Sequence, residues 1–274
     1  MALQPLPHWR PWSIFLSFWT HRALVVQLAK REVVKRYRGS ALGLVWAMAY
    51  PLMILVIYTF VFRVIFKAQW QQEGSHVDYA LILFAGLIVY NFFSECLGAA
   101  PALLQNHQSY VKKVVFPLEI LPWVLIGNAL FHAVVSVLVL IAGLLVIQKE
   151  LPWTLIFLPV VWVPLLLLTI GFTWIVSSLS VYLRDIGQVV SVGLVLLMFV
   201  SPILYPVSAI PESIEPYAFL NPLTPILVQA RQVAVFGEMP SPVMWIAMMA
   251  VTWLFAWAGL IWFQKTRAGF ADVL

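Results

Sequence analysis

Cationic side chains gather in one short stretch near the beginning of this sequence. Arg22 precedes it, and five more follow closely: Lys30, Arg31, Lys35, Arg36 and Arg38. A guanidinium group can bond two phosphate oxygens at once, so Arg36 and Arg38 suit the recognition of an anionic head group. Polybasic segments beside membranes are also common as plain topology anchors. We favour the anchor and keep head-group recognition as the alternative.

Two further sets of polar side chains recur at helical spacing in apolar surroundings. They are Asn128, His132 and Ser136, and then Thr169, Thr173 and Ser177, with Ser180 three residues further on. Residues four apart share one face of a helix, so each set forms a stripe. A stripe can pack helices together or line a pathway with hydroxyl, amide and imidazole groups. Packing is favoured for the Thr/Ser stripe, because hydroxyls can bond their own backbone. Both interpretations stay open for the other stripe, since Asn and His are harder to hide in lipid.

Signatures of catalysis and of bound cofactors are missing from the sequence. It has no G-x-x-x-x-G-K-[ST] loop, so the chain is not expected to bind ATP in that manner. Its one cysteine, Cys96, and five scattered histidines give no metal-ligand spacing. No Ser/His/Asp or paired-carboxylate arrangement points to catalytic residues. Glu95 is expected near the inner end of an apolar span, where its carboxylate can reach the interface.

Composition sets the class of protein. Of the 274 residues, 63% are hydrophobic and 10% are charged, with a mean hydropathy of +0.95. This leaves too little polar surface to cover a soluble domain, and only helices or closed barrels cross membranes. We therefore predict an all-α integral membrane protein, residues 1–274 forming one transmembrane domain. The net charge of +5 is attributed to attraction by anionic lipid and not to nucleic-acid binding.

The apolar segments predict six spans of ~20 residues or more. They cover about 42–66, 79–100, 121–147, 153–182, 186–205 and 243–263. An amphipathic helix over 13–38 is expected to lie in the membrane interface before them. The basic stretch 30–38, which we call the basic collar, stands directly before the first span. In the predicted topology most Lys and Arg residues fall on the same side of the membrane as this collar. The positive-inside rule then predicts that both termini are cytoplasmic.

Two connections differ from ordinary loops. Residues 101–120 are too polar to span and end in the elbow FPLEILP, whose prolines restrict their neighbours. This stiff cytoplasmic segment suits the transmission of force from a partner, or a plain re-entry into the next span.

The second connection, 206–240, is expected outside. Asn221-Pro222 and Thr224-Pro225 each resemble a helix cap followed by proline, and Gly237 would end that helix. The helix, about 225–236, is too short to cross the membrane and too apolar for water. We expect it to dip partway back as an outer gate, sheltered by protein.

Several segments together resemble a known family. They are RYRGSALGLVWAMAYPLMILVIYTFVF, KKVVFPLEILP, YLRDI, SPILYP and NPLTPI, with Arg231 a few residues on. In this order, over nearly the full chain, they look like the membrane permease of type-2 ABC exporters. The branch that exports O-antigen, capsular polysaccharide or teichoic acid is the most similar.

The resemblance implies a homodimer with six transmembrane helices per subunit, in the bacterial cytoplasmic (inner) membrane. It also implies two copies of a separate ATP-binding cassette subunit, which would bind ATP and Mg, whereas this chain would bind no cofactor. The implied cargo is an undecaprenyl-diphosphate-linked polysaccharide, with membrane lipid as a further contact and no nucleic acid. A separate ATPase agrees with the missing phosphate loop.

The resemblance also implies roles for residues. Head-group recognition would fall to Arg36, Tyr37, Arg38, Leu42 and Gly43. Coupling to the ATPase would fall to Asn106, Lys112, Lys113, Phe116 and Pro117. The outer gate would comprise Tyr205, Pro206, Asn221, Pro222 and Arg231. Asn91 stands where family members often have Trp, so no role is assigned to it.

Export of O-antigen is the function we expect, by a transport subunit that is not itself an enzyme. Capsule or teichoic acid export, or export of a small hydrophobic cargo such as a drug or haem, is the first alternative. A membrane-embedded lipid-modifying enzyme is the alternative of another class, and it should turn over without any ATPase subunit.

Overall fold

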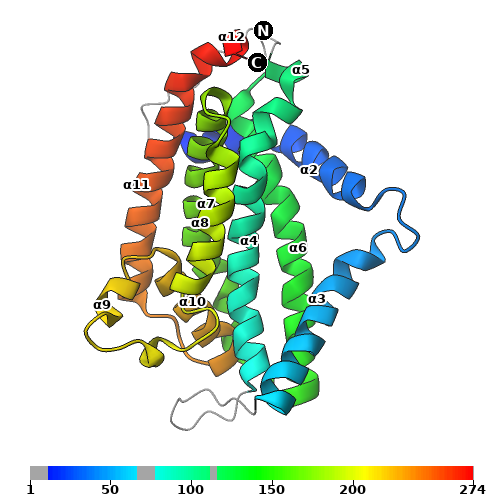
Figure 1. Cartoon of the computed structure of the whole chain (residues 1–274), viewed down its shortest axis with the longest axis vertical. Coiled ribbons are helices and arrows are strands. Elements are labelled where there is room, and N and C mark those ends of the chain that lie inside the picture. The colour runs from blue at the N-terminus through cyan, green and yellow to red at the C-terminus, as the bar shows by residue number, and fades with distance from the viewer. Residues whose placement is uncertain (1–11, 67–77, 112–115, 274) are drawn as a thin grey trace.

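The computed structural model describes residues 12–66, 78–111 and 116–273, and in these ranges the chain forms helices and connections without any strand. The α-helices are α1 (Ser13–Thr20), α2 (Arg22–Tyr37), α3 (Val45–Tyr58), α4 (Tyr79–Asn106), α5 (Gln108–Val111), α6 (Leu121–Gly143), α7 (Leu158–Tyr182), α8 (Ile186–Val200), α9 (Glu215–Ala218), α10 (Leu223–Arg231), α11 (Pro242–Thr266) and α12 (Phe270–Val273). Figure 1 shows the long helices running side by side, with α5 and α12 at the same end of the bundle.

Helices long and apolar enough to cross a membrane number five in the described ranges. They are Val45–Phe62, Tyr79–Asn106, Leu118–Gln148, Trp153–Tyr182 and Pro242–Val273. The prediction of an all-α integral membrane protein is confirmed. The expected span at 186–205 differs, because α8 has 15 residues. At helical rise these reach about 22 Å, less than the ~30 Å of a hydrocarbon core.

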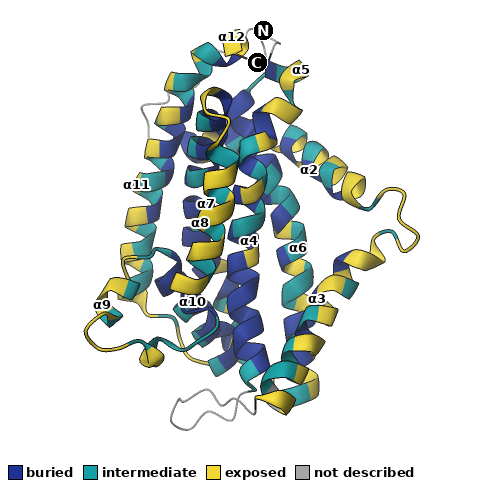
Figure 2. Ribbon diagram, viewed as in Figure 1, coloured by how far each residue is buried: buried dark blue, intermediate teal, exposed yellow. Residues whose placement is uncertain are grey.

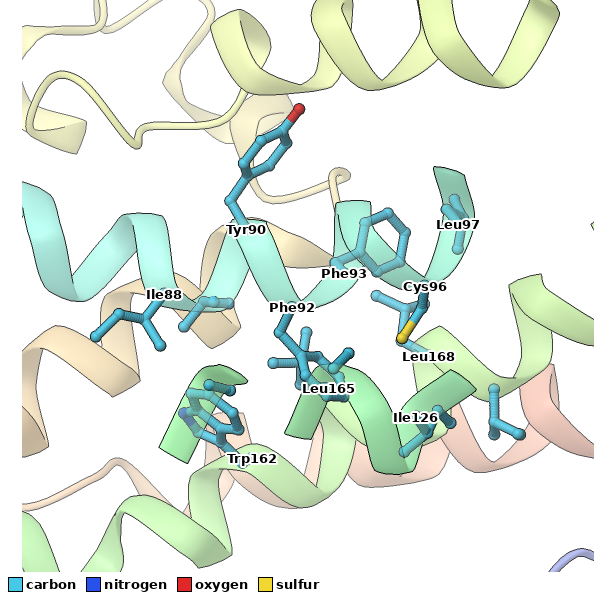
Figure 3. Close-up of a cluster of buried hydrophobic side chains, with 14 of the residues drawn as sticks. Ile88, Tyr90, Phe92, Phe93, Cys96, Leu97, Ile126, Trp162, Leu165 and Leu168 are labelled. Carbon is cyan, nitrogen blue, oxygen red and sulfur yellow. The ribbon is translucent and has the colours of Figure 1, made fainter. Parts of the chain in front are cut away.

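Helix α4 is the centre of the bundle. Figure 2 shows it buried along most of its length, whereas α8 is largely exposed. The side chains of α4 meet those of α6 and α7 in an apolar core that includes Cys96 (Figure 3). The Phe92 and Trp162 rings there lie 5.6 Å apart. Asp78 begins the helix by accepting a hydrogen bond from the Ala80 N–H, at 3.0 Å. The helix continues through Pro101 to Asn106, beyond the predicted end, because one proline removes a single backbone bond.

Helices α7 and α11 pack closely because glycines face each other. A Cβ placed on Gly259 would lie 2.7 Å from the Gly171 carbonyl oxygen, and one on Gly171 would lie 3.0 Å from the Ala256 Cα. Small residues that let backbones approach are the usual means of joining helices in lipid, where the hydrophobic effect gives no drive.

The chain leaves helical structure after α8, and Arg231 donates hydrogen bonds to the backbone carbonyls that follow that helix. The Arg231 guanidinium donates to the carbonyls of Pro202 at 2.6 Å, Ile203 at 2.5 Å and Ile82 at 3.1 Å. The Tyr79 hydroxyl donates to the Leu204 carbonyl at 2.6 Å. Carbonyls released at a helix end need partners from the protein where water is excluded. Arg231 therefore fixes α10 to both α4 and the end of α8.

The helix predicted at about 225–236 begins earlier, at Leu223, and continues as a π-helical turn to Phe236. Gly237 ends it with a φ of 71°, a left-handed conformation that glycine adopts easily. Pro222 occupies the N-cap position and has no side-chain cap, while the Oδ1 of the preceding Asn221 accepts from the Leu223 N–H at 3.1 Å. The cap expected at Thr224 is wrong, because Thr224 lies inside the helix.

The helix expected over 13–38 is divided in two at His21, which has non-helical angles. Helix α2 lies against α6 through Val25, Ala29 and Val33, which are buried. After a turn at 38–44, α3 leaves at a steep angle, so that α2 and α3 form a V at one edge of the molecule (Figure 1).

Gly86 provides a test of the Arg231 contact. A Cβ on Gly86 would lie 2.5 Å from Arg231 Nη2, an atom that its carbonyl bonds hold in place. We expect Gly86→Ala to lower the free energy of unfolding by about 1–3 kcal/mol through overpacking.

Gly98→Ala on the same helix is the matched control, because the nearest atom, Leu194 Cδ1, would be 3.8 Å away. It should leave stability unchanged or raise it by up to about 1 kcal/mol, since alanine favours helix. Denaturant unfolding in detergent micelles measures both variants. Equal stabilities for the two would contradict the close contact.

Candidate functional site

A cavity of about 560 Å³ occupies the V between α2 and α3, bounded behind by α4 and α6. It is lined by Arg36, Tyr37, Ser40, Trp46, Ala47, Tyr50, Pro51, Asn91, Ser94, Glu95, His132 and Ser136. The side chains from α2, α4 and α6 are mainly polar, whereas α3 contributes two aromatic rings. The cavity therefore combines one guanidinium, one carboxylate, several other hydrogen-bonding groups and flat apolar faces.

Glu95 is the centre of the polar wall. Its Oε1 accepts from Arg36 Nη1 at 2.6 Å and from Asn128 Nδ2 at 3.0 Å. His132 Nδ1 lies 2.8 Å from the same oxygen and 3.0 Å from Oε2. Groups from two other helices, α2 and α6, thus meet on one carboxylate of α4. A charge inside the membrane is tolerated when it is paired and hydrogen-bonded in this way.

Tyr37 extends this network from α2 to α6. Its hydroxyl lies 2.9 Å from His132 Nε2. On the other side of the ring, His132 Nδ1 lies within hydrogen-bonding distance of the Glu95 carboxylate and 3.3 Å from Arg36 Nη1. Burial raises the pKa of Tyr37 above the ordinary value for a phenol, so the hydroxyl keeps its proton at neutral pH. The last turn of α2 is thereby fixed to the bundle.

A second cavity, of about 430 Å³, lies beyond the Arg36–Glu95 pair. It is lined by Glu32, Lys35, Arg36, Glu95, Ala99, Leu103, Asn106, His107, Val124, Leu125 and Asn128. Arg36 and Glu95 belong to both linings. The ion pair therefore forms part of the partition between the two cavities.

The structure brings together part of the predicted head-group set. Arg36 and Tyr37 line the first cavity. Arg38 follows the last residue of α2 and is exposed, and neither Leu42 nor Gly43 belongs to the lining of either cavity. Gly43 has a φ of 51° in the turn between α2 and α3. Arg36 and Tyr37 at the end of α2 line the cavity, whereas the turn that follows them projects away from the bundle (Figure 1).

The two polar stripes differ in their surroundings. His132 and Ser136 line the first cavity and Asn128 the second, so the α6 stripe faces polar space. The α7 stripe of Thr169, Thr173 and Ser177 is fully buried and belongs to neither cavity. Its hydroxyls donate to carbonyls of their own helix at 2.7, 2.7 and 3.3 Å, respectively. Such bonds to the helix's own backbone are the ones expected of hydroxyls in a stripe that packs helices together.

The predicted coupling residues fall in different places. Asn106 ends α4 and lines the second cavity. Lys112 and Lys113 lie outside the described residues. Phe116 stacks on Tyr110 with centroids 4.4 Å apart, and Pro117 precedes a 3-10 turn, Leu118–Ile120, that leads into α6.

A contact that the sequence did not reveal joins this elbow to the C-terminal segment. Arg267 donates to Glu119 Oε2 at 2.8 Å and to the Phe116 carbonyl at 2.9 Å. Trp174 Nε1 donates to the Glu119 carbonyl at 3.2 Å. Arg267 and Glu119 are 148 positions apart in the sequence, so no local spacing could predict their contact. The elbow, α7 and the segment after α11 are thus held together.

The predicted outer-gate residues form internal contacts around the break after α8. The Tyr205 hydroxyl donates to the Phe199 carbonyl at 2.9 Å, and Pro206 follows it in extended backbone. The Asn221 amide donates to Ser201 Oγ at 2.7 Å, and Pro222 leads into α10. Arg231 is buried, in the carbonyl contacts described above. In this chain these residues hold the segment between α8 and α11 against the bundle.

Glu95, Trp46 and Tyr50 are site residues that the sequence analysis did not select. Glu95 was expected to reach the membrane interface, yet its carboxylate turns toward α6 and Arg36. A carboxylate within an apolar span is itself a signal of function, and the sequence shows this signal at Glu95. The aromatic pair carried no such signal, because aromatic residues are frequent throughout the sequence. In the described ranges, no group of His, Cys, Asp or Glu residues is arranged to hold a metal ion.

Comparison with known proteins identifies the family. Residues 23–235 match the family described as ABC-2 type transporter. The chain belongs to the ABC-2 type transporter family. It is similar to the O-antigen export system permease protein RfbA of Myxococcus xanthus, at 28% identity over 93% of this chain and 97% of that protein.

Other relatives of this ABC-2 chain carry similar names. An O-antigen export system permease protein RfbA of Klebsiella pneumoniae is 28% identical over 92% of this chain and 95% of that protein. The polysialic acid transport protein KpsM of Escherichia coli is 24% identical over 87% of this chain and 92% of its own length.

The contact between Arg267 and Glu119 should make a measurable contribution to stability. In a double-mutant cycle of Arg267→Gln and Glu119→Gln, we expect a coupling free energy of about 1–2 kcal/mol, because the pair is charge-assisted and largely buried.

The exposed pair of Lys35 and Glu32, 3.6 Å apart, serves as the control cycle and should couple by no more than about 0.5 kcal/mol. Unfolding in detergent micelles measures both cycles. A coupling between Arg267 and Glu119 no larger than the control would contradict the tie between elbow and C-terminal segment.

Proposed function

We propose that this chain is the membrane subunit of an ATP-driven exporter that moves lipid-linked polysaccharide, in the first place O-antigen, across the bacterial cytoplasmic membrane. Membership of the ABC-2 type transporter family supports transport. The names of the relatives that align over most of the chain support a polysaccharide cargo. The chain would itself be no enzyme and would bind no cofactor.

The proposed assembly is a homodimer with two copies of an ATP-binding cassette subunit. Because the sequence has no Walker-type phosphate loop, ATP and Mg would be bound by that partner. The partner would dock at the end of the bundle that carries α5, the elbow and α12 (Figure 1). Both termini would be cytoplasmic, as the basic residues of α2 and of the C-terminal segment favour.

The cavity between α2 and α3 is the observation that carries the proposal. An undecaprenyl-diphosphate-linked polysaccharide has a multiply charged head group, an apolar tail and a sugar chain. Arg36 would bond the phosphate oxygens in a bidentate manner. Trp46 and Tyr50 offer flat faces for sugar rings, and Asn91 and Ser94 offer neutral hydrogen bonds. The exposed apolar side of α3 faces the lipid from which the tail would approach.

Export would then begin with lateral entry of the lipid-linked cargo into the V. Its head group would bind at Arg36, close to the His132–Glu95 network. Movement of the ATPase subunits would reach the bundle through the elbow, which contacts α7 and the segment after α11. The glycan would pass outward along a path formed by the two copies.

Reconstitution tests the function. The chain and its ATPase, placed together in proteoliposomes, should translocate undecaprenyl-diphosphate-linked O-polysaccharide only when ATP is supplied. ATPase activity stimulated by small hydrophobic compounds and not by the glycan lipid would favour the small-cargo alternative. Chemical conversion of the lipid without the ATPase would favour an enzyme and contradict the proposal.

The head-group role of Arg36 predicts a difference between two neighbouring arginines. Arg36→Gln should lower the export rate about tenfold or more, as expected for loss of a charge-assisted contact of about 1.5–3 kcal/mol. Arg38→Gln removes the same charge from an exposed position outside the cavity and should stay within about twofold of wild type.

Glycan transport in the reconstituted complex measures the effect, with melting temperature as the check on folding. Equal losses in the two variants would point to general attraction by the basic collar and against a defined site.

A further inference from the structure

The Arg36–Glu95 pair has an arrangement that suggests more than a structural contact. The two atoms closest to each other, Nη1 and Oε1, are 2.6 Å apart. The Arg36 side chain is nevertheless 56% exposed and the Glu95 side chain 26% exposed. The pair lines both cavities, so a molecule in either one can reach it. An accessible ion pair can exchange partners with a ligand of the same charge as one of its members.

The two members are held differently. If Arg36 turned away, Glu95 would keep Asn128 Nδ2 at 3.0 Å and His132 Nδ1 at 2.8 Å. Both partners come from α6, within the packed bundle. Arg36 stands in the last turn of α2, three residues before Gly39, whose φ of 87° is left-handed. Arg36 can therefore change partners without leaving the carboxylate bare, which is the usual penalty for breaking such a pair.

We propose that Glu95 is the specificity-determining residue of this cavity: its carboxylate holds Arg36 against singly charged phosphate lipids and yields it to a lipid diphosphate. This inference rests on the proposed function. A carboxylate fixed beside its partner acts at a high effective concentration, so a free ligand must offer more than an equal charge. A phosphodiester lipid carries one negative charge and gains little by the exchange. A diphosphate carries more charge and more acceptor oxygens, so it displaces the carboxylate.

Selection of this kind is an example of discrimination by competition. Phosphodiester lipids outnumber any carrier lipid in a bacterial membrane, and the cavity opens between helices that face lipid. Arg36 is the one Lys or Arg among the described residues that line the first cavity. If Glu95 did not hold Arg36, the commonest anionic lipid would bind to this guanidinium. A built-in competitor lowers both affinities by the same factor, so the weaker ligand falls below the affinity it needs to occupy the cavity and the stronger ligand does not.

Binding of two fluorescent lipids, undecaprenyl diphosphate and phosphatidylglycerol, each added by itself to the purified chain in phosphatidylethanolamine nanodiscs, tests the inference. In the wild type, undecaprenyl diphosphate should bind and phosphatidylglycerol should not reach half-saturation. Glu95→Gln keeps the shape and removes the competing charge, so each affinity should rise about tenfold, the factor of roughly one charge-assisted contact, and phosphatidylglycerol binding should become measurable. Glu238→Gln removes an exposed acid that lines neither cavity and should leave both affinities unchanged.

A second background keeps the test independent of folding. In Arg36→Gln, the added change Glu95→Gln should have no effect on either affinity, because no guanidinium remains to be contested. An unchanged affinity for phosphatidylglycerol in Glu95→Gln, or the same change with and without Arg36, would overturn the role of Glu95. A wild type that binds undecaprenyl diphosphate no better than undecaprenol would instead contradict the head-group site itself.

Discussion

A charge or a free backbone carbonyl inside a membrane needs a partner from the protein, because lipid offers none. This chain meets that requirement twice, in opposite ways. Arg231 is buried and bonded to carbonyls that the helix break after α8 leaves without helical partners. Glu95 is bonded to side chains from two other helices at the wall of a cavity. The first arrangement closes a break in the fold, and the second leaves an ion pair within reach of a ligand.

Both arrangements depend on α4. The Ile82 carbonyl accepts from Arg231, and Glu95 stands more than three turns further along the same helix. The helix is buried over residues 80–90 and carries partly exposed side chains further along, near the cavities (Figure 2). The fold therefore fixes one end of α4 rigidly and presents the other to α2, which is held by Tyr37 and Arg36.

Much of this was predictable from the sequence, since apolar length and helical spacing are local properties. The all-α membrane class, the apolar helices and the position of Gly237 as a helix end followed from such patterns. The length of α8 could not be predicted in this way. The helix ends before Ser201, which accepts a hydrogen bond from Asn221, a residue twenty positions further along the sequence. The partners of Glu95 were equally beyond a local pattern. Spacing aligned Asn128 and His132 on one face but could not indicate which helix that face meets.

The central claim of the proposed function is that a lipid-linked anion enters at the cavity between α2 and α3. Photocrosslinking from position 46 tests this entry most directly. Trp46 would be replaced by benzoylphenylalanine, and Val243, exposed on α11, would be replaced likewise as the control. Radiolabelled undecaprenyl-diphosphate-linked polysaccharide should label position 46 strongly and position 243 weakly, and excess unlabelled lipid should suppress the signal at 46. Equal labelling at both positions, unaffected by the competitor, would contradict a head-group site in this cavity.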